Sequence, residues 1–386
     1  MGLKVIDLFS GCGGSALGFK QAGFEIKVAL DIDKAASNTF RKNFPETCVL
    51  TEDVTTVSGK ALLESAGLNN GDDLILLGCP PCQGFSTARR NSQRLTDPRN
   101  QLINEFVRLV KEIRPSYFVM ENVPGLAKRI GSTLFSNAIK EFSVAGYEII
   151  YDIFDTADFG IPQRRKRLVL MGTREKNVRL SFPKKTHEDP LRNSGALPRW
   201  VTVRDTIANL VHISAGEKSE RDPMHSSANL SETNLKRMKS TPPDGGGREF
   251  WNEELVLECH KDKNGFKDVY GRMKWDSPSP TITGGCTMIS KGRFGHPEQN
   301  RAISLREAAR LQTFPDSFIF EGNFGQIADQ IGNAVPVLLT KRIGDALMES
   351  ITEATKLESV LNTNVNYSLP EINGFSNSVN SPFGVA

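Results

Sequence analysis

Short apolar runs alternate with longer amphipathic stretches through the first 173 residues of the chain. Uninterrupted apolar runs of a few residues are typical of buried strands, and apolar residues three or four apart are typical of helices. The pattern predicts strands at 5–9, 26–30, 48–50, 74–77, 117–120, 148–154 and 168–171, and helices at 13–22, 33–43, 102–113 and 132–145. This alternation predicts an α/β fold with a mostly parallel, doubly wound sheet.

Beyond these elements the chain becomes rich in Pro, Gly, Ser and charged residues, which predicts a smaller, loop-rich domain. Periodicity returns at Ser304, where Ser304 and Glu307 form a capping box for a helix at 305–312, and a last helix is expected at 337–355. The predicted organisation is a large domain at 1–173, a loop-rich domain at 174–301, a return to the large domain at 302–355, and a poorly ordered Asn/Ser-rich tail at 356–386.

Bulk composition changes this picture little. A hydrophobic content of 38% and a charged content of 24% are ordinary for a soluble globular protein. The net charge of +3 neither requires nor excludes a nucleic-acid partner, because the distribution of charge matters more than its sum. The six cysteines follow no disulfide or zinc pattern. The sequence also shows no signal peptide and no apolar run long enough to span a bilayer. These features predict a cytoplasmic protein that binds neither a membrane nor a metal.

The most informative stretch is the loop at 78–86, Gly-Cys-Pro-Pro-Cys-Gln-Gly-Phe-Ser, which follows an apolar run. Two prolines between glycines can neither continue a strand nor begin a helix, so the chain turns there. Open α/β sheets place reactive groups at strand ends. The position predicts that Cys82 is a thiolate nucleophile and that Glu121, after the next predicted strand, is its acid partner. A dithiol pair with Cys79 also fits the spacing, although both intervening residues are Pro.

A glycine-rich turn at 11–14 joins the first predicted strand to the first helix, and glycines there let the backbone approach a ligand closely. Asp31, at the end of the second strand, is placed to accept hydrogen bonds from ribose hydroxyls, and Asp53 to accept from an adenine amino group. The G-x-G-x-x-G spacing is absent, which disfavours a nicotinamide dehydrogenase and favours a nucleoside cofactor without a pyrophosphate. A plain structural turn would explain the glycines about equally well.

Six blocks in this order resemble the cytosine-C5 DNA methyltransferases. They are 7–14 (Asp-Leu-Phe-Ser-Gly-Cys-Gly-Gly), 80–86 (Pro-Pro-Cys-Gln-Gly-Phe-Ser), 121–124 (Glu-Asn-Val-Pro), 163–167 (Gln-Arg-Arg-Lys-Arg), 306–316, which begins Arg-Glu-Ala-Ala-Arg-Leu-Gln, and 332–336 (Gly-Asn-Ala-Val-Pro). One block could be accidental, whereas an ordered set across most of the chain is specific. The resemblance implies an S-adenosylmethionine-dependent methyltransferase (Rossmann-like) fold, with 174–301 as the target recognition domain.

The resemblance also implies a reaction, the transfer of a methyl group from S-adenosyl-L-methionine to C5 of cytosine in a specific double-stranded DNA sequence. Cys82 matches the nucleophile that adds to C6, Glu121 the acid at N3, and Arg165 an arginine at the cytosine carbonyl oxygen. This geometry cannot form inside a duplex, so the base must swing out. The loop after Cys82 carries arginines suited to hold phosphates: Arg89, Arg90, Arg94 and Arg99.

The residues that match the family's cofactor pocket lie in five parts of the chain. They are Phe9, Gly11, Cys12 and Gly13 in the glycine-rich turn, Asp31 and Ile32 for the ribose, Asp53 and Val54 for the adenine, and Leu102 and Asn333, which complete the pocket. Asp31 stands where the family more usually has glutamate. Arg306 and Glu307 are expected to organise the recognition domain rather than to do chemistry.

The expected partner is double-stranded DNA, bound by a monomer of the prokaryotic restriction–modification or orphan type, with a cognate restriction endonuclease acting separately. Two other functions remain open. A tRNA cytosine-C5 methyltransferase shares the architecture, but its usual Cys-Phe-Thr signature is absent. A catalytically inactive DNA-binding regulator is disfavoured because Cys82, Glu121 and Arg165 are all present.

Overall fold

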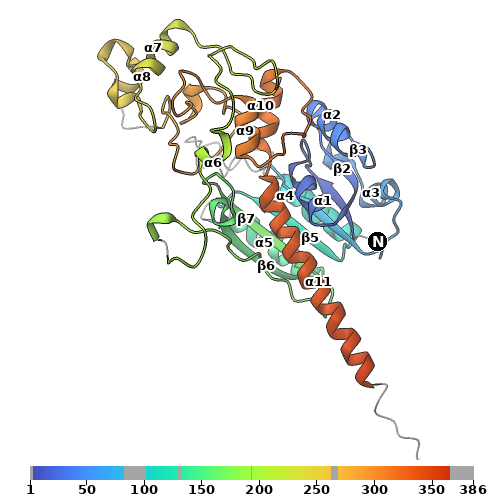
Figure 1. Ribbon diagram of the computed structural model, residues 1–386. Coiled ribbons are helices and arrows are strands. Elements are labelled where there is room, and N and C mark those ends of the chain that lie inside the picture. Colours follow the sequence, from blue (N-terminus) through green and yellow to red (C-terminus); the bar gives the residue numbers. More distant parts are fainter. Residues whose placement is uncertain (1–2, 82–100, 129–131, 193, 262–267, 366–386) are drawn as a thin grey trace, which may run out of the picture.

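The computed structural model describes residues 3–81, 101–128, 132–192, 194–261 and 268–365, with side chains as far as Leu357. A seven-stranded sheet in the order β3-β2-β1-β4-β5-β7-β6 lies at its centre, with helices on both sides (Figure 1). Its strands are β1 (Lys4–Leu8), β2 (Glu25–Leu30), β3 (Cys48–Leu50), β4 (Leu74–Gly78), β5 (Tyr117–Asn122), β6 (Glu148–Asp155) and β7 (Lys166–Thr173). β7 runs antiparallel to both of its neighbours, and all other pairs are parallel. The predicted α/β fold with a mostly parallel sheet is confirmed.

Both faces of the sheet are buried, which explains why its central strands are apolar throughout. In β4, Ile75 and Leu77 belong to the hydrophobic core on one face, and Leu74 and Leu76 belong to the core on the other. The first core lies under α1 (Gly14–Gln21), α2 (Lys34–Asn43) and α11 (Val337–Val365), and the second under α3 (Gly59–Ala66), α4 (Leu102–Ile113) and α5 (Ser132–Val144).

The last helix, α11, returns the chain to the sheet by packing on α1. The packing is close, because a Cβ on Gly18 would lie 2.1 Å from Thr340 Oγ1. The sequence-based end of this helix at residue 355 was wrong, since α11 continues to Val365 and projects beyond the body (Figure 1). No Gly or Pro interrupts the chain from 345 to 365, so nothing in the backbone ends the helix earlier.

Two helices of the large domain were not predicted from the sequence. α3 begins at Ser58, whose side chain accepts a hydrogen bond from the Ala61 amide. α10 (Phe324–Asn333) begins at Asn323, which forms a capping box with Gln326. This Asn-x-x-Gln signal is legible in the sequence and was missed. The predicted capping box of α9 (Leu305–Leu311), between Ser304 and Glu307, is confirmed.

Between residues 174 and 301 the described chain forms short helices, turns and isolated bridges and contributes no strand to the sheet. Its helices are α6 (Val203–Ile207), α7 (Glu232–Ser240) and α8 (Glu258–Lys261). The buried guanidinium of Arg272 cross-links this region, because it donates to four backbone carbonyls and one amide oxygen, those of Met238, Thr241, His296, Gln299 and Asn300. Burial lowers the pKa of Arg272 to about 10. Such bonds satisfy loop carbonyls that have no strand or helix partner.

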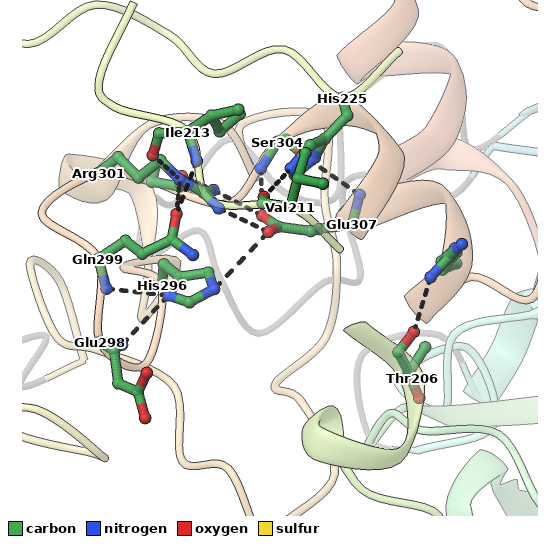
Figure 2. Close-up of polar contacts among 12 residues, drawn as sticks. Thr206, Val211, Ile213, His225, His296, Glu298, Gln299, Arg301, Ser304 and Glu307 are labelled. Atoms are coloured by element: carbon green, nitrogen blue, oxygen red, sulfur yellow. Dashed lines mark hydrogen bonds and ion pairs between the residues drawn. The ribbon is translucent and has the colours of Figure 1, made fainter. Parts of the chain in front are cut away.

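A buried polar network joins the loop-rich region to α9 (Figure 2). Arg301 makes two hydrogen bonds of 2.7 Å to the carboxylate of Glu307, which also accepts from the Ser304 amide. Burial raises the pKa of Glu307, but the hydrogen bonds from Arg301 outweigh it and the pKa falls to about 2. Burial lowers the pKa of the neighbouring His296 to about 3, so this imidazole is held neutral.

This network predicts how stability depends on pH. As pH falls below about 6.5, the unfolded chain protonates His296 while the folded chain does not, and below about 4.5 the same applies to Glu307. As pH falls, the free energy of unfolding decreases wherever the unfolded state binds more protons than the folded state. The urea midpoint of the wild type should therefore fall steadily from pH 6.5 toward pH 3. Replacing Glu307 by Gln should cost roughly 3 kcal/mol at pH 7, because Arg301 is left buried without its acid.

Urea unfolding followed by circular dichroism measures both effects. Glu141→Gln is the matched control, because Glu141 pairs with Lys111 at the surface, where an ion pair contributes little. A Glu307→Gln protein as stable as this control at pH 7 would contradict the account of the network.

Candidate active site

A cavity of about 1460 Å³ opens where β1, β2, β4 and β5 end. Residues from five of the six sequence blocks line it. The sixth block, 306–316, lies in and after α9, and Glu307 within it belongs to the buried network described above. The sheet therefore gathers segments far apart in the chain around one cavity, as expected for the carboxyl ends of strands in an open α/β fold.

The turn after β1 forms one wall of this cavity. Phe9 and Gly11 have φ angles of 56° and 52°, a left-handed conformation that costs a non-glycine residue free energy. The Gly11 amide donates to Oδ2 of Asp31 at 2.7 Å, and the Asp33 amide donates to its Oδ1 at 2.8 Å. Burial raises the pKa of Asp31. Each carboxylate oxygen keeps a second acceptor site, so Asp31 can still bind hydroxyl groups.

Nine of the ten residues expected to bind the cofactor line the cavity: Phe9, Gly11, Cys12, Asp31, Ile32, Asp53, Val54, Leu102 and Asn333. Gly13 is not among the lining residues, and it precedes α1 with a φ of 97°. Cys12 is buried, and its Sγ lies 3.7 Å from the Gln330 carbonyl, so the thiol is directed into the protein. Burial raises the pKa of this thiol to about 12, which makes Cys12 unreactive at neutral pH.

Charge is divided between the two ends of the cavity. Asp31, Asp33, Glu52 and Asp53 follow β2 and β3 at one end. At the other end, Lys128 follows β5, and Arg164, Lys166 and Arg167 lie just before or at the start of β7. The acidic end suits a cationic ligand, and the basic end suits an anionic one.

The acidic end also has the features of a nucleoside site. Ile32 is 69% exposed and lines the cavity, so it offers an apolar surface for a planar ring. Ser10 Oγ is buried against the same cavity, and no partner among the described residues satisfies it. A ligand with a ring, hydroxyl groups and a positive charge therefore fits this end.

At the basic end, Glu121 and Arg167 form an ion pair of 2.5 Å between Oε1 and Nε. Glu121 is at the end of β5, Arg167 is near the start of the adjacent β7, and both side chains are nearly buried. Sequence reasoning identified Glu121 and missed Arg167. Arg165 and Arg167 stand in the same block, and only the pairing of β5 with β7 shows that Arg167 contacts the carboxylate.

Arg165 also lines the cavity, but within the described chain its hydrogen bonds go to the backbone. Its Nη1 donates to the carbonyls of Ile282 and Gly332, at 2.9 and 3.4 Å. Burial, followed by the charge of Arg167, lowers the pKa of Arg165 to about 9. Its Nε is buried and has no partner among the described residues, so the fork retains a donor.

Arg165 thereby fastens a segment of the loop-rich region onto the end of α10. A Cβ on Gly332 would lie 2.0 Å from the Thr283 carbonyl carbon and 2.1 Å from the Gly284 amide. The two backbones are in direct contact there, and only glycine permits this approach. Thr281 and Thr283 of this segment line the cavity next to Arg165.

The loop that begins after β4 approaches the same end. Pro80 and Pro81 line the cavity, and Asn122 Nδ2 donates to the Pro80 carbonyl at 3.0 Å. Cys82 follows directly, but it lies outside the described residues, as do Arg89, Arg90, Arg94 and Arg99. Cys79 is described. Its Sγ is 3.4 Å from Ser15 Oγ, and burial raises its pKa well above the usual value, so it is a poor nucleophile.

Within the described ranges, no group of three or more His, Cys, Asp or Glu side chains is arranged to hold a metal ion. In the same ranges, no helix combines the length and apolar character needed to cross a bilayer.

Comparison with known proteins assigns the family. Residues 3–349 match the family model described as C-5 cytosine-specific DNA methylase. The chain is 38% identical over 366 residues to the type II methylase M.HgiDII of Herpetosiphon aurantiacus, which covers 92% of this chain and 99% of that one. It is 37% identical over 353 residues to the type II methyltransferase M1.HphI of Haemophilus parahaemolyticus, with 91% and 88% coverage.

A solved structure gives the same assignment. A protein described as a DNA modification methyltransferase encoded within a prophage (E. coli) superposes with a TM-score of 0.67 and 26% identity, over 91% of this chain and 99% of that one. The Dnmt2 methyltransferase of S. pombe, at 20% identity and a TM-score of 0.62, shares the fold. The chain therefore belongs to the C-5 cytosine-specific DNA methylases and is a DNA (cytosine-5-)-methyltransferase.

Proposed function

We propose that the enzyme binds S-adenosyl-L-methionine at the acidic end of the cavity and an extruded cytosine at the basic end, and that methyl transfer proceeds through a covalent adduct with Cys82. The observation that carries the proposal is the Glu121–Arg167 pair, which lies in the same cavity as the turn after β1. One cavity of about 1460 Å³ has room for both a nucleoside cofactor and a pyrimidine.

The cofactor would supply an electrophilic methyl group on a sulfonium centre. Asp31 would accept from the ribose hydroxyls, Asp53 from the adenine amino group, and Ile32 would pack against the ring. Oδ1 of Asp53 already accepts from Thr55, so Oδ2 is the oxygen available to the adenine. Backbone atoms of Gly11 and Cys12 would contact the amino-acid part, with Leu102 and Asn333 closing the pocket. Gly13 would act indirectly, because it shapes the turn rather than lining the cavity.

At the basic end, the Cys82 thiolate would add to C6 of cytosine, and Glu121 would deliver a proton to N3 as negative charge develops. C5 then becomes nucleophilic and takes the methyl group. Transfer of the C5 proton to solvent, departure of the thiolate from C6 and return of the N3 proton to Glu121 would then restore the aromatic ring, the free cysteine and the acid. A cytosine inside a duplex cannot reach this cavity, so the proposal includes extrusion of the base.

Arg167 and Arg165 would have different roles next to the cytosine. Arg167 would orient Glu121, because it already contacts that carboxylate. Arg165 would direct its free Nε toward the cytosine carbonyl oxygen while Nη1 holds the Ile282 carbonyl. Because Arg165 bonds to Ile282 in the loop-rich segment and to Gly332 near the end of α10, the same side chain would couple the base pocket to both.

The wider biological context follows from the relatives. Because the relatives named above are type II methyltransferases, a restriction–modification role is favoured, with a cognate endonuclease acting separately. DNA is favoured over tRNA for the same reason. The Glu121–Arg167 pair disfavours an inactive regulator. We further propose a catalytic domain at 1–173 and 302–355, a target recognition domain at 174–301, and a monomer that acts on DNA in the cytoplasm.

Bisulfite sequencing of DNA from a methylation-free host that expresses the chain tests the proposal. We expect 5-methylcytosine at one short sequence motif on both strands or one, and none in a host that expresses the Glu121→Gln variant. Unmodified cytosine throughout the wild-type sample would contradict the proposed function.

A further inference from the structure

Arg164 lies at the basic rim of the cavity and is held on two sides although its side chain is 46% exposed. Its Nε donates to Oδ2 of Asp155 at 2.7 Å, and its guanidinium carbon lies 4.3 Å from the centre of the Trp200 ring. Its backbone is fixed as well, because its amide donates to the Ser279 carbonyl and its carbonyl accepts from Thr281 Oγ1.

This arrangement leaves the outer edge of the guanidinium available. Within the described part of the chain, no hydrogen-bond partner reaches Nη1 or Nη2 of Arg164. An exposed arginine normally loses side-chain freedom when it binds, whereas Arg164 has already lost much of it. The two parallel N–H groups of its outer edge match the oxygens of a phosphate group.

Two lysines share the rim with Arg164, but they are held differently. Lys128 and Lys166 line the cavity, and among the described residues neither forms an ion pair. Their ammonium groups would have to be ordered on binding, and they lack the planar fork. Of these three cations, Arg164 is the one whose position is set before a ligand arrives.

The occupant is defined by the reaction. The enzyme acts on DNA, and a cytosine that enters the cavity brings its own phosphates to the rim. We propose that Arg164 binds the DNA phosphate adjacent to the extruded cytosine and thereby positions the target nucleotide. This inference rests on the proposed function, because a phosphate reaches the rim only if the base enters the cavity.

The chain contains a matched control for this role. Arg204 has similar surroundings, since its Nε donates to Oδ1 of Asp276 at 2.7 Å, its guanidinium lies 5.2 Å from the Trp275 ring, and it is 48% exposed. It differs in that its Nη2 also donates to Oδ2 of Asp276, at 3.1 Å. Arg204 does not line the cavity. If the contacts of Arg164 serve only local structure, then replacing either arginine should have the same effect.

The test uses a duplex that contains the site mapped with the wild-type enzyme. For Arg164→Gln we expect KM for this duplex to rise about tenfold, with kcat and KM for S-adenosylmethionine nearly unchanged. In fluorescence anisotropy, the plot of log binding constant against log salt concentration should become shallower by about 0.9, the slope lost with one phosphate contact. Arg164→Lys should recover the slope because it keeps the charge. Arg204→Gln should match the wild type in every measurement.

An unchanged salt slope for Arg164→Gln, or an equal change for Arg204→Gln, would overturn the inference while leaving the proposed function intact. A wild-type enzyme that methylates no cytosine would overturn the proposed function and this inference with it.

Discussion

Replacing Cys82 by Ala should lower the rate of methyl transfer by about 10⁴-fold or more, because without the thiolate C5 of cytosine is too weakly nucleophilic to be methylated. Binding of S-adenosylmethionine should persist, since the residues proposed to hold it belong to other segments of the cavity wall. Single-turnover transfer of a radiolabelled methyl group gives the rate, and isothermal titration gives the cofactor affinity.

The neighbouring Cys79 provides the control for this prediction. Burial raises its pKa well above the usual value, and its Sγ is directed to Ser15, so Cys79→Ala should retain methylation. If Cys79→Ala and Cys82→Ala were both inactive, under oxidising and under reducing conditions, catalysis would require both thiols and not Cys82 alone. Methylation by Cys82→Ala at the wild-type rate would refute the nucleophile assignment.

Replacing Glu121 by Gln should lower kcat by about 10²–10⁴-fold, the range that general acid–base groups contribute. Glutamine keeps the size of the side chain and can contact N3, but it cannot deliver a proton to it. Because the carboxylate also pairs with Arg167, the variant leaves that guanidinium without its acid, and folding must be checked by thermal unfolding. KM for S-adenosylmethionine should change little, since Glu121 lies at the opposite end of the cavity from Asp31.

Two further variants separate the proton transfer by Glu121 from the effect of removing a charged side chain. Arg167→Gln should lower kcat less than Glu121→Gln does, because it removes the orienting partner and not the acid. Glu64→Gln, which alters an exposed ion pair with Lys60, should leave kcat unchanged. A Glu121→Gln enzyme with wild-type kcat would show that N3 receives its proton from elsewhere.

The strands and most helices around the sheet could be predicted from the sequence, because strands buried on both faces are marked by uninterrupted apolar runs. β3 was predicted with its observed bounds, Cys48–Leu50. The antiparallel insertion of β7 between β5 and β6 could not be predicted, since apolar runs carry no information about strand order. The end of α11 was placed too early because a polar composition was interpreted as disorder, although no Gly or Pro interrupts the chain from 345 to 365.

The candidate site was predicted unevenly for physical reasons. Residues at strand ends, such as Asp31 and Glu121, could be located because strand ends converge in an open sheet. The role of Arg167 depends on a register between two strands, and the contact of Gly332 with Thr283 depends on the packing of the loop-rich segment against α10. Neither contact produces a periodic pattern in the sequence from which it could be predicted. The sequence identified Arg164 only as one residue of a matching block. Its fixed side-chain position depends on contacts with Asp155, at the end of β6, and with Trp200, in the loop-rich region.

The proposed mechanism depends on a covalent bond between the sulfur of Cys82 and C6 of an extruded cytosine. It is tested most directly by incubating the enzyme and S-adenosylmethionine with a duplex that carries 5-fluorocytosine at the mapped target position, followed by mass spectrometry under denaturing conditions. Fluorine cannot leave as a proton does, so we expect one protein–DNA adduct, with the methylated base attached at Cys82. The unfluorinated duplex serves as the control and must be methylated. If the fluorinated duplex then forms no adduct, or forms one at another residue, the covalent mechanism through Cys82 is contradicted.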